Sequence, residues 1–402
     1  MRVLYERCCG LDVHKKSVVA CVVTPELRQI RTFGSTTGQL LELADWLRAE
    51  EVTHVAMEST GVYWKPVYNL LEEEFTVWVV NAHHIKAVPG RKTDVKDAEW
   101  IADLLKHGLV RPSFIPDRPQ RELRELVRYR RSLIQERSRE VNRIQKVLEG
   151  ANIKLASVAS DALGASGRAM LAAIVVGEED PKVLADLAKG QLRDKRRELE
   201  EALRGMVGPH QRLLLATQLR HIDFLEQEIG RLDAEVAQRL SPFEEELQVV
   251  DTIPGIARRG AEGILAEMGT DMSRFATPGH LASWAGVCPG NNRSAGKRKR
   301  SPTKGGNVSL QSTLVEAARA AARTRTYLGA QYHRLAPRIG ANRAAMAVAH
   351  SIAVILHSLL KTKTPYIDLG ANYFDERDQQ ATLRRAVRRI ERLGFKVTVE
   401  AA

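Results

Sequence analysis

Residues 8–23 read CCGLDVHKKSVVACVV, and their two apolar runs flank the polar residues 14–16. This pattern predicts two strands joined by a short turn, and a third extended segment follows at residues 29–33. The periodicity then switches between helix and strand, which predicts helices at 37–50, 62–74 and 94–107 and strands at 52–57 and 75–80. Three consecutive strands followed by this alternation indicate a mixed sheet with helices on both faces.

The order β, β, β, α, β, α, β, α is the layout of the ribonuclease H superfamily, and we expect an α/β domain at residues 1–117. From residue 119 the chain turns to charged helices. Apolar positions in residues 211–240 are spaced alternately three and four apart, which is typical of a coiled-coil seam. We therefore expect a helical coiled-coil stalk at residues 118–246 and a mainly helical C-terminal domain at residues 247–402. Burial of each long helix on its own domain is the alternative.

The composition favours a polyanionic partner. The 402 residues carry a formal charge of +12 and the pI is about 9.6. Clustered Lys and Arg bind phosphates by releasing counterions, although an acidic lipid surface would also attract them. The sequence lacks both an apolar run of about 18 residues and a signal-peptide pattern, so we expect a soluble, cytoplasmic protein with no membrane partner. The four cysteines form no CxxC pair, which favours buried thiols over a zinc site or a disulfide framework.

Four carboxylates are placed to meet at one edge of the predicted sheet. Asp12 ends the first strand, Glu58 directly follows the strand at 52–57, and Asp94 and Asp97 lie in the first turn of a helix. Strand ends and the following helix starts converge in alternating folds, and oxygen ligands of this number suit Mg²⁺ or Mn²⁺. Stabilisation of a helix N-terminus explains either helical aspartate without a metal. An aspartate inside an apolar strand, however, is costly to bury without a partner.

A second candidate site is the glycine-rich basic loop at residues 288–307. Ser294 lies in this loop among cations that would attract a phosphate, namely Arg293, Lys297, Arg298, Lys299, Arg300 and Lys304. The residues alone leave Ser301 as an equal candidate for a nucleophile and allow both serines to be ordinary loop residues. The preceding turn TIPGI at residues 252–256 is similar to a helix-hairpin-helix element, which offers backbone amides to DNA phosphates.

Several motifs together resemble one family. GLDVH at 10–14, MESTGVYW at 57–64, NAHH at 81–84 and KTDVKDA at 92–98 resemble the N-terminal domain of the DEDD-type bacterial insertion-sequence transposases, which are bridge-RNA-guided recombinases. Further motifs resemble their second domain: TIPGI at 252–256, SAGK at 294–297 and GN at 306–307. One departure is Gln311, which stands where the family usually has a basic residue, and it leaves the choice between Ser294 and Ser301 open.

The resemblance implies a mechanism. Asp12, Glu58, Asp94 and Asp97 would be the metal ligands of a RuvC-like domain, and Ser294 would form a covalent phosphoserine link to DNA. Partners would be DNA, a guide RNA that reads element ends and target by base pairing, and further copies of the chain in a dimer or tetramer joined through the coiled coil. Active sites would be composite between protomers, with a Holliday-junction-like intermediate.

Two alternatives remain beside this transposase. One is a metal-dependent junction nuclease that uses activated water and needs no serine. The other is a non-catalytic nucleic-acid-binding scaffold.

Overall fold

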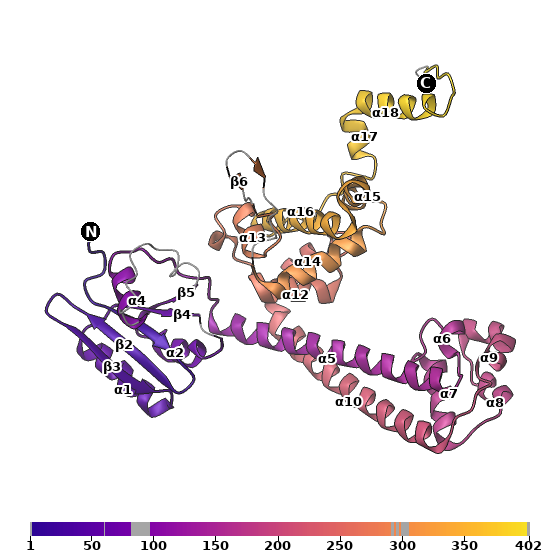
Figure 1. The fold of residues 1–402 in the computed structure, drawn as a ribbon, viewed down its shortest axis with the longest axis horizontal. Coiled ribbons are helices and arrows are strands. Elements are labelled where there is room, and N and C mark those ends of the chain that lie inside the picture. The colour runs from indigo at the N-terminus through magenta and orange to yellow at the C-terminus, as the bar shows by residue number, and fades with distance from the viewer. Residues whose placement is uncertain are drawn as a thin grey trace. The chain divides into compact units, whose positions relative to one another are not determined.

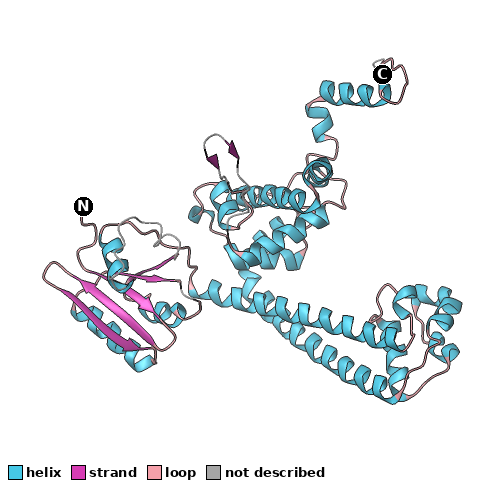
Figure 2. Cartoon of the chain, in the orientation of Figure 1, coloured by secondary structure: helices cyan, strands magenta, loops and turns pink. Residues whose placement is uncertain are grey.

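The computed structural model describes residues 2–59, 61–81, 97–290, 293–294, 297–298 and 305–399. The chain divides into two compact units, Met1–Pro116 and Asp117–Ala402, which are traced in Figure 1. The predicted division of the second unit at residue 246 stays a prediction. Figure 2 shows that the long strands belong to the first unit, and that helices make up most of the second.

The first unit contains a five-stranded mixed sheet. Its order is β3-β2-β1-β4-β5. The first three strands form an antiparallel meander, and β4 and β5 run parallel to β1. The mixed sheet predicted from the sequence is therefore confirmed. The strands are β1 (Cys8–Val13), β2 (Ser17–Val23), β3 (Arg28–Gly34), β4 (His54–Glu58) and β5 (Thr76–Val80).

Helices cover both faces of this sheet, as predicted. Helices α1 (Thr37–Ala49) and α2 (Trp64–Leu71) bury Leu43 and Val67 against Leu11 and Met57. Helix α4 (Asp97–Lys106) covers the opposite face, where its Ile101 and Leu105 pack with Cys8, Cys21 and Ala56. Because successive strand residues point to opposite faces, the alternation along β1 assigns Leu11 to one core and Cys8 to the other.

The cysteines of the sheet are buried, as the sequence indicated. Cys8, Cys9 and Cys21 are free thiols in the core. Burial raises the pKa of Cys8 to about 12 and that of Cys21 to about 11. The thiols are therefore protonated at neutral pH and act as small apolar side chains.

Gly10 determines how closely α4 approaches the sheet. A Cβ atom at this position would overlap the Ala98 carbonyl oxygen and lie 2.9 Å from the Cα of Ala102. The thiol of Cys8 contacts the Ala102 carbonyl at 3.8 Å, so α4 runs antiparallel to β1. Its first residue, Asp97, consequently lies toward the carboxyl end of β1.

The second unit begins with an antiparallel pair of long helices, α5 (Arg118–Gly150) and α10 (Pro209–Leu240), shown in Figure 1. Arg137 pairs with Glu226 at 2.6 Å, and Arg239 pairs with Glu122 at 3.0 Å. Between these pairs Leu133 packs against the seam of α10. The apolar seam predicted for α10 is thus buried against α5 of the same chain. The prediction that this seam joins protomers stays untested.

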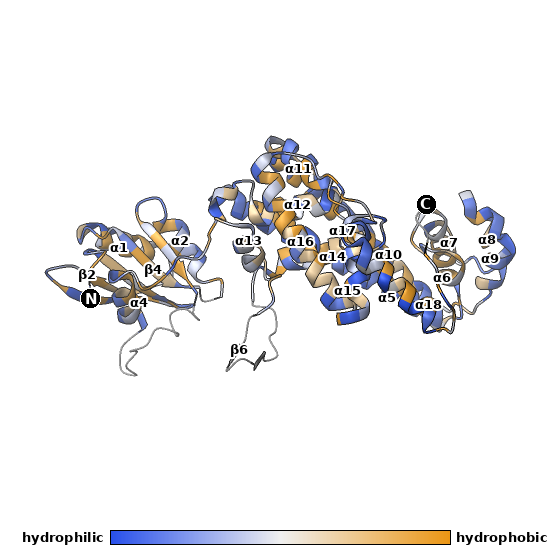
Figure 3. Cartoon of the chain, turned by 90° about the horizontal axis from the view of Figure 1, so that it is seen from above, coloured by the Kyte–Doolittle hydropathy of each residue, from blue (hydrophilic) through white to orange (hydrophobic). Residues whose placement is uncertain are grey.

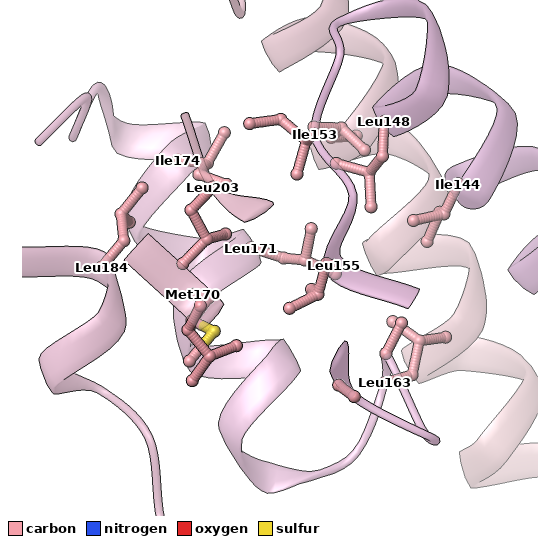
Figure 4. Packing of buried hydrophobic residues seen from close by; sticks show 14 of the residues in the cluster. Ile144, Leu148, Ile153, Leu155, Leu163, Met170, Leu171, Ile174, Leu184 and Leu203 are labelled. Atoms are coloured by element: carbon pink, nitrogen blue, oxygen red, sulfur yellow. The ribbon is translucent and has the colours of Figure 1, made fainter. Parts of the chain in front are cut away.

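A small helical bundle closes the far end of the pair. Residues from α5, α10 and the helices between them share one apolar core, and Figure 4 shows Leu155, Met170, Leu171 and Leu203 meeting there. The intervening helices are α6 (Leu155–Val158), α7 (Ala165–Val176), α8 (Pro181–Asp186) and α9 (Arg196–Ala202), with the 3-10 helix η1 (Gly190–Lys195).

The C-terminal part packs around α16 (Ala341–Thr362), whose apolar stretch is visible in Figure 3. Among the described residues, α16 alone is long and apolar enough to cross a membrane. Its Val348, Ile352 and Leu356 are fully buried against neighbouring helices, which accounts for the composition. The other helices are α11 (Glu244–Asp251), α12 (Arg258–Met268), α13 (Pro278–Trp284), α14 (Val308–Ala321), α15 (Tyr327–Ile339), α17 (Tyr373–Arg377) and α18 (Gln379–Glu391), with η2 (Ser241–Phe243) and η3 (Met272–Arg274).

We predict that Gly10→Ala destabilises the first unit by about 1–3 kcal/mol, because α4 must shift to make room for the new methyl group. Four of the five tryptophans, Trp46, Trp64, Trp78 and Trp100, lie in this unit, so urea unfolding followed by tryptophan fluorescence reports on it. Gly38→Ala is the matched control, because nothing lies within 4 Å of its added Cβ. Equal unfolding midpoints for the two variants would contradict the close approach of α4.

Candidate active site

Asp12 and Glu58 lie side by side at the carboxyl edge of the sheet. The parallel register of β1 and β4 pairs Gly10 with Ala56 and Leu11 with Met57, and the next residue on each strand is one of the two carboxylates. By alternation both side chains extend from the face that α4 covers. Both residues are partly buried, and among the described residues neither has a Lys or Arg partner. Two adjacent carboxylates without a cation repel each other.

Asp97 comes to the same edge from another element. It is the first residue of α4, and the following residue, Ala98, rests on Gly10 two positions before Asp12. The antiparallel course of α4 therefore brings the N-terminal end of the helix to the edge where Asp12 and Glu58 lie. Asp94 falls outside the described residues. Within the described part of the chain, no three His, Cys, Asp or Glu side chains form a group that could hold a metal ion.

His14 is a candidate that the sequence reasoning did not include. Its Nε2 atom lies 3.0 Å from Oδ2 of Asp12, in a hydrogen bond whose donor depends on the tautomer. The signal was present in the sequence, because residues two apart in an extended segment point to the same side. His14 can orient the Asp12 carboxylate by this contact.

The serine loop contains a short antiparallel ladder. Strand β6 (Arg293–Ser294) pairs with β7 (Lys297–Arg298), and Ser294 stands opposite Lys297 in the register. Only the backbone of these four residues is described. Ser301 and the cations Lys299, Arg300 and Lys304 lie outside the described residues. The register makes Lys297 the cross-strand neighbour of Ser294, a place from which a cation can reach a phosphate at the serine.

The net positive charge is confined to the last part of the chain. Residues 1–290 contain 40 Lys and Arg against 42 Asp and Glu, whereas residues 291–402 contain 21 against 7. Most arginines of α5 and α10 are used in ion pairs within the chain, such as Arg130 with Asp233 and Arg231 with Glu228. The excess charge that could attract a polyanion therefore lies in the serine loop and beyond it.

Helix α18 concentrates this charge on one side. Arg384, Arg388 and Arg392 follow one another at intervals of four, with Arg389 beside them, and the apolar Leu383, Val387 and Ile390 lie on the opposite side. None of the α18 side chains that the structure describes is buried. Among the described side chains, these four arginines have no acidic partner. The basic side of α18 is available to phosphates.

Two family models match the chain. The first, described as "Transposase" and of the DEDD, IS110 type, covers residues 9–153. The second, described as "Transposase IS116/IS110/IS902 family", covers residues 247–334. The first range includes all four predicted carboxylates, and the second includes the serine loop.

Two known proteins are similar in sequence. The chain is 26% identical over 296 residues to "Transposase for insertion sequence element IS1111A" from Coxiella burnetii, and the match covers 72% of each chain. It is 29% identical over 79 residues to "Pilin gene-inverting protein" from Moraxella lacunata, covering 19% of this chain and 22% of the relative.

Proposed function

The chain belongs to the IS110 family of insertion-sequence transposases, and we propose that it cuts and rejoins DNA by combining a metal-binding carboxylate set with a serine nucleophile. Its activity as a DNA transposase follows from the family. The comparisons give no support to the alternative of a junction nuclease. The observation that supports the proposal is the adjacent placement of Asp12 and Glu58, which follow paired residues of β1 and β4, together with a serine in a loop rich in cations.

We assign the divalent ion to Asp12, Glu58, Asp94 and Asp97. The neighbouring carboxylates Asp12 and Glu58 fit a hard cation, because their ladder position holds them together and neither pairs with a Lys or Arg among the described residues. A bound Mg²⁺ or Mn²⁺ would stabilise charge on the reacting phosphate oxygens. The protein itself fixes the ligands, with Gly10 seating the start of α4 and His14 orienting Asp12.

Ser294 is the proposed nucleophile. Its hydroxyl oxygen forms a bond to the phosphorus of a DNA phosphodiester, while the bond from that phosphorus to one deoxyribose oxygen breaks. The serine proton goes to a base, and the departing oxygen takes up a proton. One ester bond replaces another, so the reverse reaction with a different DNA hydroxyl rejoins the strands without an energy source. Lys297, opposite Ser294, would hold the phosphate during both steps.

The proposed partners are DNA at element ends and target, a guide RNA, and other copies of the chain in a dimer or tetramer. The charge of residues 291–402 suits both nucleic acids. The guide RNA rests on the family resemblance. Since the seam of α10 is buried on α5, contacts between protomers would use other surfaces of these helices. We place the protein in the cytoplasm, where DNA and a guide RNA are both accessible.

We predict that Ser294→Ala abolishes the covalent protein–DNA adduct, because it removes the attacking oxygen while leaving the cations of the loop. The measurement is denaturing electrophoresis of the protein with labelled element-end DNA and any RNA that co-purifies with it. Ser301→Ala is the control and should retain the adduct. An adduct that persists in Ser294→Ala and disappears in Ser301→Ala would transfer the role to Ser301.

We predict that Asp12→Asn lowers strand cleavage by at least about 100-fold in Mg²⁺, because a ligand for the ion is lost. DNA affinity should be unchanged, since no cation is removed. The matched control is Glu73→Gln, which neutralises an exposed carboxylate of the same unit. Calorimetry should show weaker Mn²⁺ binding by Asp12→Asn and unchanged Mn²⁺ binding by Glu73→Gln. Full cleavage by Asp12→Asn would reject the assignment of the metal site.

We predict that α18 contributes to nucleic-acid binding through phosphates. Changing Arg384, Arg388, Arg389 and Arg392 together to Gln should reduce the slope of log affinity against log salt by up to about 3.6 for duplex DNA. The same four positions changed to Lys should retain the slope. Arg204→Gln with Arg231→Gln is the control, because these exposed arginines are paired with Glu201 and Glu228. A slope unaltered by the α18 substitutions would show that phosphates do not reach this helix.

A further inference from the structure

The two ends of the serine loop are joined in a narrow neck, formed by Gly286, Gly306, Asn307 and Gln311. A Cβ atom on Gly306 would lie 2.5 Å from the Cα of Gly286 and 2.7 Å from the carbonyl oxygen of Trp284. The backbone N–H of Asn307 donates to that carbonyl oxygen at 2.9 Å. Gln311, where the family usually has a basic residue, donates from Nε2 to the Gly286 carbonyl at 2.6 Å. The chain thus leaves and re-enters the loop at one point.

Asn307 connects this neck to two other elements. Its Oδ1 accepts the backbone N–H of Leu310 at 3.1 Å, which caps the N-terminus of α14. Its Nδ2 donates to Oε2 of Glu267 on α12 at 2.7 Å. The oxygen and the nitrogen of the amide each have a required partner, so its orientation is determined.

Glu267 in turn connects the neck to α5. Its side chain is 1% exposed, and Arg128 donates to both carboxylate oxygens, at 2.7 and 2.8 Å. Arg124 lies 3.5 Å from the same carboxylate and also donates to the Glu267 carbonyl oxygen. Burial raises the pKa of Glu267, but the hydrogen bonds from Arg128 and Asn307 outweigh it and leave the pKa below its usual value. Glu267 therefore remains ionised at neutral pH.

Arg124 reaches the other end of the loop as well. Its guanidinium carbon lies 5.6 Å from the centre of the Trp284 ring, and the Trp284 carbonyl is the acceptor of Asn307 N–H. Burial lowers the pKa of Arg124 to about 10, which still leaves it charged at neutral pH. Two arginines on successive turns of α5 therefore reach both ends of the neck. Arg124 lies over Trp284 before the loop, and Arg128 pairs with Glu267, which accepts the hydrogen bond from Asn307 after the loop.

We propose that Glu267 and Asn307 are positioning residues for the reaction at Ser294. Arg124 and Arg128 of α5 hold Glu267, and Glu267 holds Asn307, so the position of α5 determines the direction in which the serine loop leaves the neck. The inference rests on the proposed role of Ser294. The hydrogen bond from Asn307 to Glu267 ties the neck to α12, and a displacement of about 1 Å can slow a reaction by about 100-fold. Apolar side chains at the neck would keep the two ends of the loop together. They would not fix the direction in which the loop leaves the neck, because apolar contacts are non-directional.

Asn307→Asp isolates this contact. Aspartate caps a helix as well as asparagine does, so the α14 cap is retained. Its carboxylate, however, faces that of Glu267, and the hydrogen bond is lost. In the double variant Glu267→Gln with Asn307→Asp, the amide and the carboxylate exchange places. The hydrogen bond then forms in the opposite direction, and one negative charge remains for the two arginines.

The experiment measures adduct formation in single turnovers and DNA affinity separately. Asn307→Asp should slow adduct formation by about 100-fold while the Kd for DNA changes by less than about threefold. The double variant should recover at least about tenfold of the rate. The matched control is Glu262→Gln, which breaks another buried ion pair, 2.7 Å from Arg130, without touching the neck. It should lower the melting temperature but leave the rate within about threefold.

Equal rate losses in Asn307→Asp and Glu262→Gln, or no recovery in the double variant, would reduce the network to a structural role and overturn the proposal. An adduct that survives in Ser294→Ala contradicts the proposed nucleophile instead, and strand cleavage then replaces the adduct as the readout. Unchanged cleavage by Asn307→Asp would overturn the positioning role in that case too.

Discussion

Buried ion pairs between α5 and α12 are the constraint on which the second unit depends. Arg130 is 4% exposed and Glu262 is 6% exposed, and their side chains meet at 2.7 Å. Removing two charges from water is costly, and breaking such a pair leaves an unpaired buried charge at a cost of about 3–5 kcal/mol. Each pair also has further partners, with Asp233 on Arg130 and Arg258 on Glu262. The relative register of α5, α10 and α12 is therefore restricted to arrangements that satisfy all of these charges together.

The elements could be predicted from the sequence because their signals are local. The two strands within residues 8–23, the mixed sheet and the long helix predicted at 211–240 follow from periodicity alone. The local sequence does not show which helix an apolar seam packs against. Leu225 and Ile229 show the same spacing whether they face a second protomer or α5 of the same chain, and in the structure they pack on α5. Likewise, no periodicity indicates that most arginines of α5 are paired with acids of the same chain.

The sequence could predict the part of the candidate site that follows from the order of the strands. Asp12 and Glu58 had to become neighbours once β1 and β4 were adjacent and parallel, and Gly10 brings the start of α4 to them. His14 was missed although its spacing of two from Asp12 was a local signal, because residues two apart in an extended segment point to the same side. The Glu267–Asn307 contact joins a residue of α12 to the N-cap of α14 forty positions later, and neither residue has a distinctive pattern around it. Such contacts depend on tertiary packing, which spacing does not encode.

Charge is distributed unevenly along the chain: residues 1–290 are nearly balanced, whereas residues 291–402 carry an excess of Lys and Arg. Where cations and acids are nearly balanced, the ion pairs stabilise the helices without an external partner. The β6–β7 ladder is different, because its register sets Arg293 directly opposite Arg298. No acid occurs between residues 291 and 304, so the Lys and Arg residues of this segment have no acidic neighbour in sequence. A polyanion such as DNA suits the uncompensated positive charge of this segment.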